Sequence, residues 1–104
     1  MNQKKLIRQK FRDAVFGRDG HKCVFCPETQ HLDAHHITDR SLMPNGGYVK
    51  ENGITLCGLH HSQAEIYHQS GGADWFEGKH PDDLYRLIGS SYEKAVAASE
   101  RLAR

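Results

Sequence analysis

Three cysteines and several histidines carry most of the chemistry that this sequence offers. Two residues separate Cys23 from Cys26, and the same spacing separates Cys57 from His60. Two tight turns with this spacing can present four thiolate and imidazole ligands to one tetrahedral zinc ion. An odd number of cysteines does not suit a disulfide framework, and all three belong to this pattern. The spacing therefore predicts a structural zinc site, with His60 rather than the adjacent His61 as its fourth ligand.

The segment between the two ligand pairs is longer than a zinc knuckle needs. Thirty residues lie between Cys26 and Cys57, whereas the spacers of common zinc motifs are roughly 12–20 residues long. Short strands are predicted at residues 31–37 and 53–56, separated by a loop rich in turn-forming residues. We therefore expect a hairpin that folds out from the zinc site and returns to it.

Two adjacent histidines, His35 and His36, lie in the first predicted strand. Because side chains alternate along a strand, we expect the two rings to point apart, with one histidine a metal ligand and the other a base. A hydrogen-bonded structural role is the alternative for either ring. A helix predicted over residues 58–68 places His61 and Glu65 one turn apart on one face. For Glu65, an ordinary surface charge is the alternative to a supporting role beside His61.

Positive charge is concentrated at the N-terminus. Residues 1–22 hold seven Lys or Arg and two Asp, a formal charge of +5, and the remaining residues sum to −4, which gives the +1 of the whole chain. A helix predicted over residues 4–17 has an apolar stripe at Ile7, Phe11 and Val15. Its basic residues form the predicted nucleic-acid-binding face: Lys4, Lys5, Arg8, Lys10 and Arg12. The asymmetry favours contact with a polyanion, with a solvated face on a packing helix as the alternative.

The C-terminal third of the chain carries no chemical motif. Residues 81–102 are predicted to be helical and to cover the core, with a capping box from Ser90 to Glu93 opening the last helix. Trp75 and Phe76 are expected to pack on the core. These helices have an acidic or neutral surface, so we do not expect them to read DNA bases.

Length and composition indicate one small domain, with its core at residues 18–68. The chain has 104 residues, within the usual size of a single domain, so we expect residues 1–104 to form one unit. No apolar run approaches the length of about 18 residues needed to cross a membrane, and the N-terminus does not resemble a signal peptide. Reduced thiolates suit a cytoplasmic location.

Four segments, taken in order, resemble the HNH endonuclease family in its zinc-stabilised form, the ββα-metal or His-Me finger. They are AHHI at 34–37, GG at 46–47, ENGITLC at 51–57 and CGLHH at 57–61. The likeness covers roughly residues 18–65. The sequence departs from the family pattern at His60, where many zinc-bearing members have cysteine, and at His35, where many have aspartate.

The resemblance implies a fold and a set of roles. The fold would be α+β, with a ββα-metal finger and a zinc knuckle flanked by an N-terminal helix and C-terminal helices. His35 and His61 would bind a catalytic divalent ion, His36 would be the general base, and Asn52 would hold the loop between the strands and orient His36. The other histidines match no position of the motif and are expected to be structural or solvated: His21, His31, His68 and His80.

The implied activity is divalent-metal-dependent hydrolysis of DNA phosphodiester bonds, leaving 5′-phosphate and 3′-hydroxyl ends. Double-stranded DNA is the expected substrate. The cofactors would be a structural Zn²⁺ and a catalytic Mg²⁺, Mn²⁺, Ni²⁺, Co²⁺ or Zn²⁺; two imidazole ligands favour the later members of that series over Mg²⁺. The alternatives are a non-catalytic zinc module that binds nucleic acid and a nuclease of the same type that acts on RNA.

Overall fold

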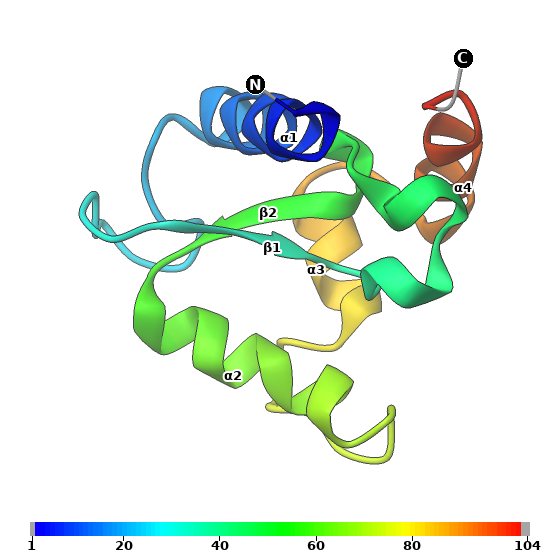
Figure 1. Ribbon diagram of the computed structural model, residues 1–104. Coiled ribbons are helices and arrows are strands. Elements are labelled where there is room, and N and C mark those ends of the chain that lie inside the picture. Colours follow the sequence, from blue (N-terminus) through cyan, green and yellow to red (C-terminus); the bar gives the residue numbers. More distant parts are fainter. Residues whose placement is uncertain (1, 103–104) are drawn as a thin grey trace.

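A two-stranded antiparallel sheet lies at the centre of the fold (Figure 1). The computed structural model describes residues 2–102, which form this sheet and four α-helices, so the α+β class is confirmed. Strand β1 (Asp33–His36) pairs with β2 (Gly53–Leu56), and the register places His36 opposite Gly53. The helices are α1 (Gln3–Asp19), α2 (Gly58–Gln69), α3 (Pro81–Leu87) and α4 (Tyr92–Glu100). None of the helices in the described part of the chain is both long and apolar enough to cross a bilayer.

Helix α1 is longer than predicted at its C-terminal end. It begins after Asn2, whose side chain accepts a backbone N–H of the first turn at 2.8 Å. The sequence offers two stop signals, Gly17 and the Asp19-Gly20 pair. Gly17 does not end the helix, because a single glycine can remain helical when its neighbours continue the turn. The helix ends instead at Gly20, which takes the left-handed conformation with φ 75°.

Helices α1 and α2 lie on opposite sides of the hairpin (Figure 1). Phe11 and Val15 of α1 are buried against β2, and each contributes about 1.5–3 kcal/mol by leaving water. Gly53 makes this close approach possible, because a Cβ at that position would lie 2.5 Å from Val15 and 2.8 Å from Phe11. Ile7 is 39% exposed, so the third member of the predicted apolar stripe does not join the core.

Strand β1 is shorter than the predicted strand over 31–37. His31 takes a positive φ of 54°, which is incompatible with an extended strand and delays the start of the ladder. At the other end, the Ile37 N–H still donates to the Asn52 carbonyl at 2.9 Å. The pairing of the strands therefore ends where the loop begins.

The loop between the strands contains three 3₁₀ helices, η1 (Arg40–Leu42), η2 (Pro44–Gly47) and η3 (Lys50–Asn52), and is tied together by Asn52. The side chain of Asn52 is fully buried. Its Oδ1 accepts from the Thr38 N–H at 2.9 Å and from the Tyr85 hydroxyl at 2.7 Å. Its Nδ2 donates to the carbonyls of Thr38 at 3.0 Å and Gly47 at 3.2 Å. One side chain thus joins both ends of the loop to its middle and to α3.

The segment between α2 and α3 corrects one prediction. Trp75 and Phe76 are 46% and 42% exposed, so the expectation that they pack on the core is wrong. The glycines around them adopt positive φ and turn the chain away from the sheet: Gly71, Gly72 and Gly78. The Trp75 ring packs instead against His80, with 4.8 Å between ring centroids.

The last helix corrects a second prediction. The N-cap of α4 is Ser91, whose side chain accepts the Lys94 N–H at 3.1 Å. Ser90, predicted to open a capping box with Glu93, instead donates its hydroxyl to the Glu51 carbonyl at 2.9 Å. A tertiary partner for Ser90 therefore moves the helix start by one residue.

Candidate active site

The four predicted zinc ligands come together at one end of the hairpin. The ligand atoms of Cys23, Cys26, Cys57 and His60 all lie within 4.8 Å of one another. The Cys26 and Cys57 sulfurs are 3.7 Å apart, and Cys23 Sγ lies 3.6 Å from His60 Nδ1. A tetrahedral zinc ion separates its sulfur and nitrogen ligands by about 3.5–3.8 Å, given its usual bond lengths. The cluster can therefore hold a structural metal ion such as zinc.

Local structure explains why these ligands meet. The Val24 N–H donates to the Thr55 carbonyl at 3.1 Å, which holds the first ligand turn against β2. Cys57 is the N-cap of α2, and His60 lies in the first turn of that helix. A hydrogen bond from the His60 backbone N–H lowers the pKa of Cys57 to about 6, which favours the thiolate that a metal requires. His61 points elsewhere, so the geometry selects His60 as the spacing predicted.

The two adjacent histidines of β1 face opposite sides of the sheet, as alternation predicts. His35 is 2% exposed and lies toward α2, with its ring centroid 5.1 Å from that of His61 and 5.2 Å from that of His68. His36 faces α1, where its ring stacks on Phe11 with a centroid separation of 4.5 Å. One strand therefore supplies one imidazole to each side of the hairpin.

A second group of potential metal ligands surrounds His35. Ligand atoms of His35, Glu65 and His68 all lie within 4.8 Å of one another. Burial, together with the nearby imidazoles of His61 and His68, lowers the pKa of His35 well below its usual value, so this ring is neutral at pH 7. His68 Nε2 lies 2.9 Å from the His36 carbonyl oxygen and donates to it. Imidazole nitrogens and a carboxylate suit Mn²⁺, Co²⁺, Ni²⁺ or Zn²⁺.

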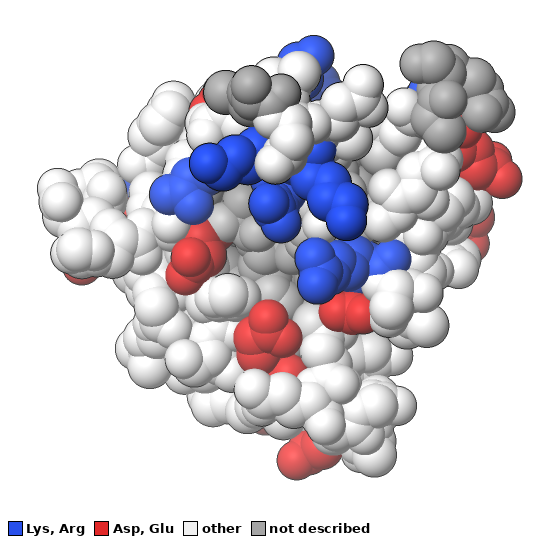
Figure 2. Space-filling view, in the orientation of Figure 1, with Lys and Arg blue, Asp and Glu red and all other residues white. Residues whose placement is uncertain are grey.

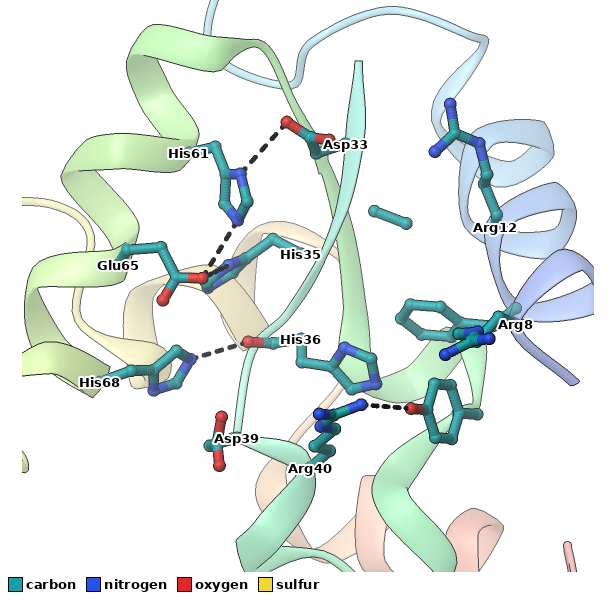
Figure 3. Close-up of a pocket in the computed structure, with 13 residues that line it drawn as sticks. Arg8, Arg12, Asp33, His35, His36, Asp39, Arg40, His61, Glu65 and His68 are labelled. Carbon is teal, nitrogen blue, oxygen red and sulfur yellow. Dashed lines mark hydrogen bonds and ion pairs between the residues drawn. The ribbon is translucent and has the colours of Figure 1, made fainter. Parts of the chain in front are cut away.

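His61 is held between two carboxylates at the edge of this group (Figure 3). Its Nδ1 lies 3.2 Å from Asp33 Oδ2, and its Nε2 lies 3.2 Å from Glu65 Oε1. A carboxylate on one nitrogen of a histidine fixes the ring and leaves the other nitrogen directed at a ligand site. Asp33 on β1 therefore orients His61 on α2 toward Glu65 and His35.

Sequence reasoning missed His68 and Asp33 in this group, and it gave Glu65 only a supporting role beside His61. His68 was expected to be structural or solvated, and for Glu65 a surface charge was the alternative. Both share a helix face with His61, at positions one and two turns further along α2, and this spacing was the available signal. Asp33 offered no such signal, because its contact with His61 spans 28 residues and depends on how α2 approaches the sheet.

His36 occupies a partly buried position between aromatic rings. Besides stacking on Phe11, it meets Tyr48 edge-on at 4.8 Å. Burial, reinforced by the positive charge of Arg40, lowers the pKa of His36 to about 4, so the ring is neutral at pH 7. Its Nε2 is buried and has no hydrogen-bond partner within the described residues. Buried polar atoms are rarely left unpaired, so this nitrogen is available to a ligand or a water molecule.

A cleft of about 400 Å³ connects these groups (Figure 3). One wall comes from β1 and α2 and carries the carboxylates and imidazoles around His35. The other wall comes from α1 and the start of the loop and carries three arginines: Arg8, Arg12 and Arg40. His36 lines the cleft between them. The cleft therefore combines potential metal ligands, a neutral imidazole and positive charge.

The predicted basic residues of α1 are all exposed, but only two of them line the cleft. Figure 2 shows Lys and Arg side chains gathered along α1, with Asp and Glu side chains below them on the same face. Arg8 and Arg12 reach the cleft, whereas the three lysines lie outside its lining: Lys4, Lys5 and Lys10. The basic surface thus continues outward from one wall of the cleft.

Comparison with known proteins adds no relative: neither protein-family models, nor curated proteins, nor solved structures match this chain.

Proposed function

We propose that this protein is a divalent-metal-dependent endonuclease of the HNH type, in which β1, β2 and α2 form a ββα-metal finger. It would hydrolyse DNA phosphodiester bonds and leave 5′-phosphate and 3′-hydroxyl ends. One observation carries the proposal: the unpartnered Nε2 of His36 lies in the same cleft as the ligand group around His35 and the arginines of the opposite wall. A zinc module that only binds nucleic acid has no use for this combination.

His36 would act as the general base. It is neutral at pH 7 because its pKa is near 4, and its free Nε2 can accept a proton from a water molecule that attacks phosphorus. The rings of Phe11 and Tyr48 hold the imidazole in place. Asn52 would act indirectly, because its side chain binds both the backbone N–H and the backbone carbonyl of Thr38, two residues beyond His36.

His35, Glu65 and His68 would hold the catalytic ion, together with His61, which is the partner that the family resemblance implies. When bound, a divalent ion neutralises charge that develops on the phosphate and on the leaving oxygen. Asp33 would keep His61 oriented for this purpose. The donors fit a borderline transition-metal ion better than Mg²⁺, which prefers oxygen ligands.

Supercoiled plasmid incubated with the protein tests the proposal. We expect the supercoiled form to disappear with Mn²⁺ or Ni²⁺ and to persist with chelator. His36→Ala should cut 10²–10⁴-fold more slowly, an order of magnitude typical of general-base removal, while retaining its fold and zinc.

The matched control is His31→Asn, because His31 is exposed, lies outside the cleft and has a left-handed backbone that Asn tolerates. It should cut like the parent. Equal cleavage by His36→Ala and the parent would refute the assignment of the base. An RNA substrate run in parallel decides which nucleic acid is cleaved, and binding without cleavage of either would favour the non-catalytic alternative.

A further inference from the structure

Arg40 differs from Arg12, the other cleft arginine that has a contact of its own, in being hydrogen-bonded to a side chain. The Arg12 guanidinium lies 4.8 Å from the centroid of the Phe16 ring and donates to the Leu32 carbonyl at 3.5 Å. Arg40 Nη1 donates to the Tyr48 hydroxyl at 3.2 Å (Figure 3). A guanidinium has five N–H donors, so this bond leaves four for a ligand. Arg40 comes from η1 within the hairpin loop, whereas the other arginines of this wall come from α1.

Tyr48 is itself fixed by its neighbours. Its ring meets His36 edge-on at 4.8 Å and Phe11 edge-on at 5.8 Å. Gly46 leaves room for this ring, since a Cβ there would lie 2.6 Å from Tyr48 Cε2. One aromatic side chain therefore sets the position of both the His36 ring and the Arg40 guanidinium.

Asp39 lines the same cleft as Arg40 and its charge attracts the guanidinium, but no salt bridge joins the two side chains. The nearest acidic neighbour in the chain, Asp39, instead caps η1, where it accepts the Ser41 N–H at 3.1 Å and the Ser41 hydroxyl. Within residues 2–102, Arg40 forms no ion pair. An unpaired, oriented guanidinium lining a cleft is a site for a phosphate oxygen, which matches its fork of donors.

We propose that Arg40, oriented by the Tyr48 hydroxyl, is the phosphate-binding residue of the cleft and contacts a non-bridging oxygen of the phosphodiester presented to His36. The inference deepens the proposed function and rests on it for the identity of the anion. Arg40 and Tyr48, whose ring packs against His36, belong to the same loop between β1 and β2. This loop would therefore position both the phosphate and the general base. The lysines of α1 would instead bind phosphates further along the strand.

The test is binding of a fluorescent DNA duplex, measured by anisotropy with Mn²⁺ present, in a His36→Ala background that prevents cleavage. Arg40→Gln should weaken binding about 10- to 100-fold, since a hydrogen bond to a charged group is worth about 1.5–3 kcal/mol. Lys50→Gln is the matched control: it removes the same charge from the same loop, but Lys50 lies outside the cleft. It should change binding less than about two-fold, a small effect for an exposed charge outside the site.

Tyr48→Phe isolates the orienting role, because it keeps the ring against His36 and removes only the hydroxyl. It should weaken binding about two- to five-fold, because the charge of Arg40 stays in the cleft and only its orientation is lost, and it should have no further effect when Arg40 is already Gln. Additive losses in the double variant would show that the hydroxyl does not act through Arg40. Thermal melts of each variant confirm that binding differences do not come from unfolding.

The result that overturns the inference is binding by Arg40→Gln within two-fold of Lys50→Gln. The inference and the proposed function fail in different ways. If the parent cuts DNA and Arg40→Gln binds normally, the phosphate assignment is wrong and the nuclease stands. If the parent cuts neither DNA nor RNA but its binding of the duplex depends on Arg40, the phosphate site stands without the catalytic function.

Discussion

Replacing Asn52 with Ala should destabilise this protein as strongly as the loss of a large core side chain. The substitution removes four hydrogen bonds made by one fully buried amide, two to Thr38 and one each to Tyr85 and Gly47. The partners left behind are mostly backbone groups of the loop, which cannot move into water without opening it. The effect should therefore appear as lost stability before it appears as lost activity.

The magnitude follows from the count of bonds. At a net value of about 1 kcal/mol for each hydrogen bond, Asn52→Ala should lower the free energy of unfolding by about 4 kcal/mol. A chain of this length has an unfolding entropy of about 0.2 kcal/mol/K near its Tm, so the expected fall in Tm is about 15–20 °C. Tyr85→Phe removes one of the four bonds together with the bond between the Tyr85 hydroxyl and Thr38 Oγ1, and it should lower the Tm by about 10 °C.

Thermal and urea unfolding followed by circular dichroism, in buffer containing zinc, measures both variants. The zinc content of Asn52→Ala should equal that of the parent, because Asn52 precedes β2 whereas Cys57 follows it. A Tm within about 5 °C of the parent would refute the reasoning, as would a loss no larger than that of Tyr85→Phe. Loss of zinc along with stability would mean that the two ends of the hairpin are not independent.

Three further predictions follow from the same structure. Purified protein should carry zinc at a ratio near one per chain, and Cys57→Ser should lose it and unfold; an intact fold without zinc in metal analysis would contradict this. Replacing Lys5, Arg8 and Arg12 together with Gln should reduce the log–log salt slope of DNA binding by about three, whereas a merely solvated face would leave the slope unchanged in a salt titration. Because the pKa of His36 is about 4 in the folded chain and near 6.5 when unfolded, acid favours the unfolded state between these values. The stability present above pH 6.5 should fall as the pH is lowered through 4, by about 2 kcal/mol more in the parent than in His36→Ala. Parallel urea titrations at several pH values measure the free energy of unfolding of both proteins, and equal losses in the two would contradict the prediction.

Several features of this protein were predictable because they depend on short spacing along the chain. The x2 spacing of Cys23–Cys26 and Cys57–His60 belongs to tight turns, and the four ligand atoms do converge. Alternation along a strand separates neighbouring rings whatever surrounds them, so His35 and His36 face different helices as expected. Covalent geometry and backbone periodicity determine such relations before any tertiary contact forms.

Helix boundaries and aromatic burial were predicted less well, because local signals there compete with tertiary partners. The capping-box pattern with Glu93 favours Ser90 over Ser91, but the carbonyl of Glu51, 39 residues away, takes the Ser90 hydroxyl and leaves Ser91 as the cap. Trp75 and Phe76 are apolar enough for a core, but the glycine-rich turns that carry them hold them at the surface. Composition alone does not say which apolar residues the backbone can bring inside.

The contents of the cleft depended on tertiary structure. The sequence by itself indicated His35, His36 and His61 as a chemical group, but it did not place Asp33 against His61 or turn Arg40 toward Tyr48. The contact between Asp33 and His61 joins strand β1 to helix α2. The contact between Arg40 and Tyr48 lies within the hairpin loop, whose shape depends on the buried side chain of Asn52. Such contacts require approach within about 3 Å, so packing decides them. The sequence thus determined which residues could do chemistry, and the packing of α1 and α2 on the hairpin decided which neighbours orient them.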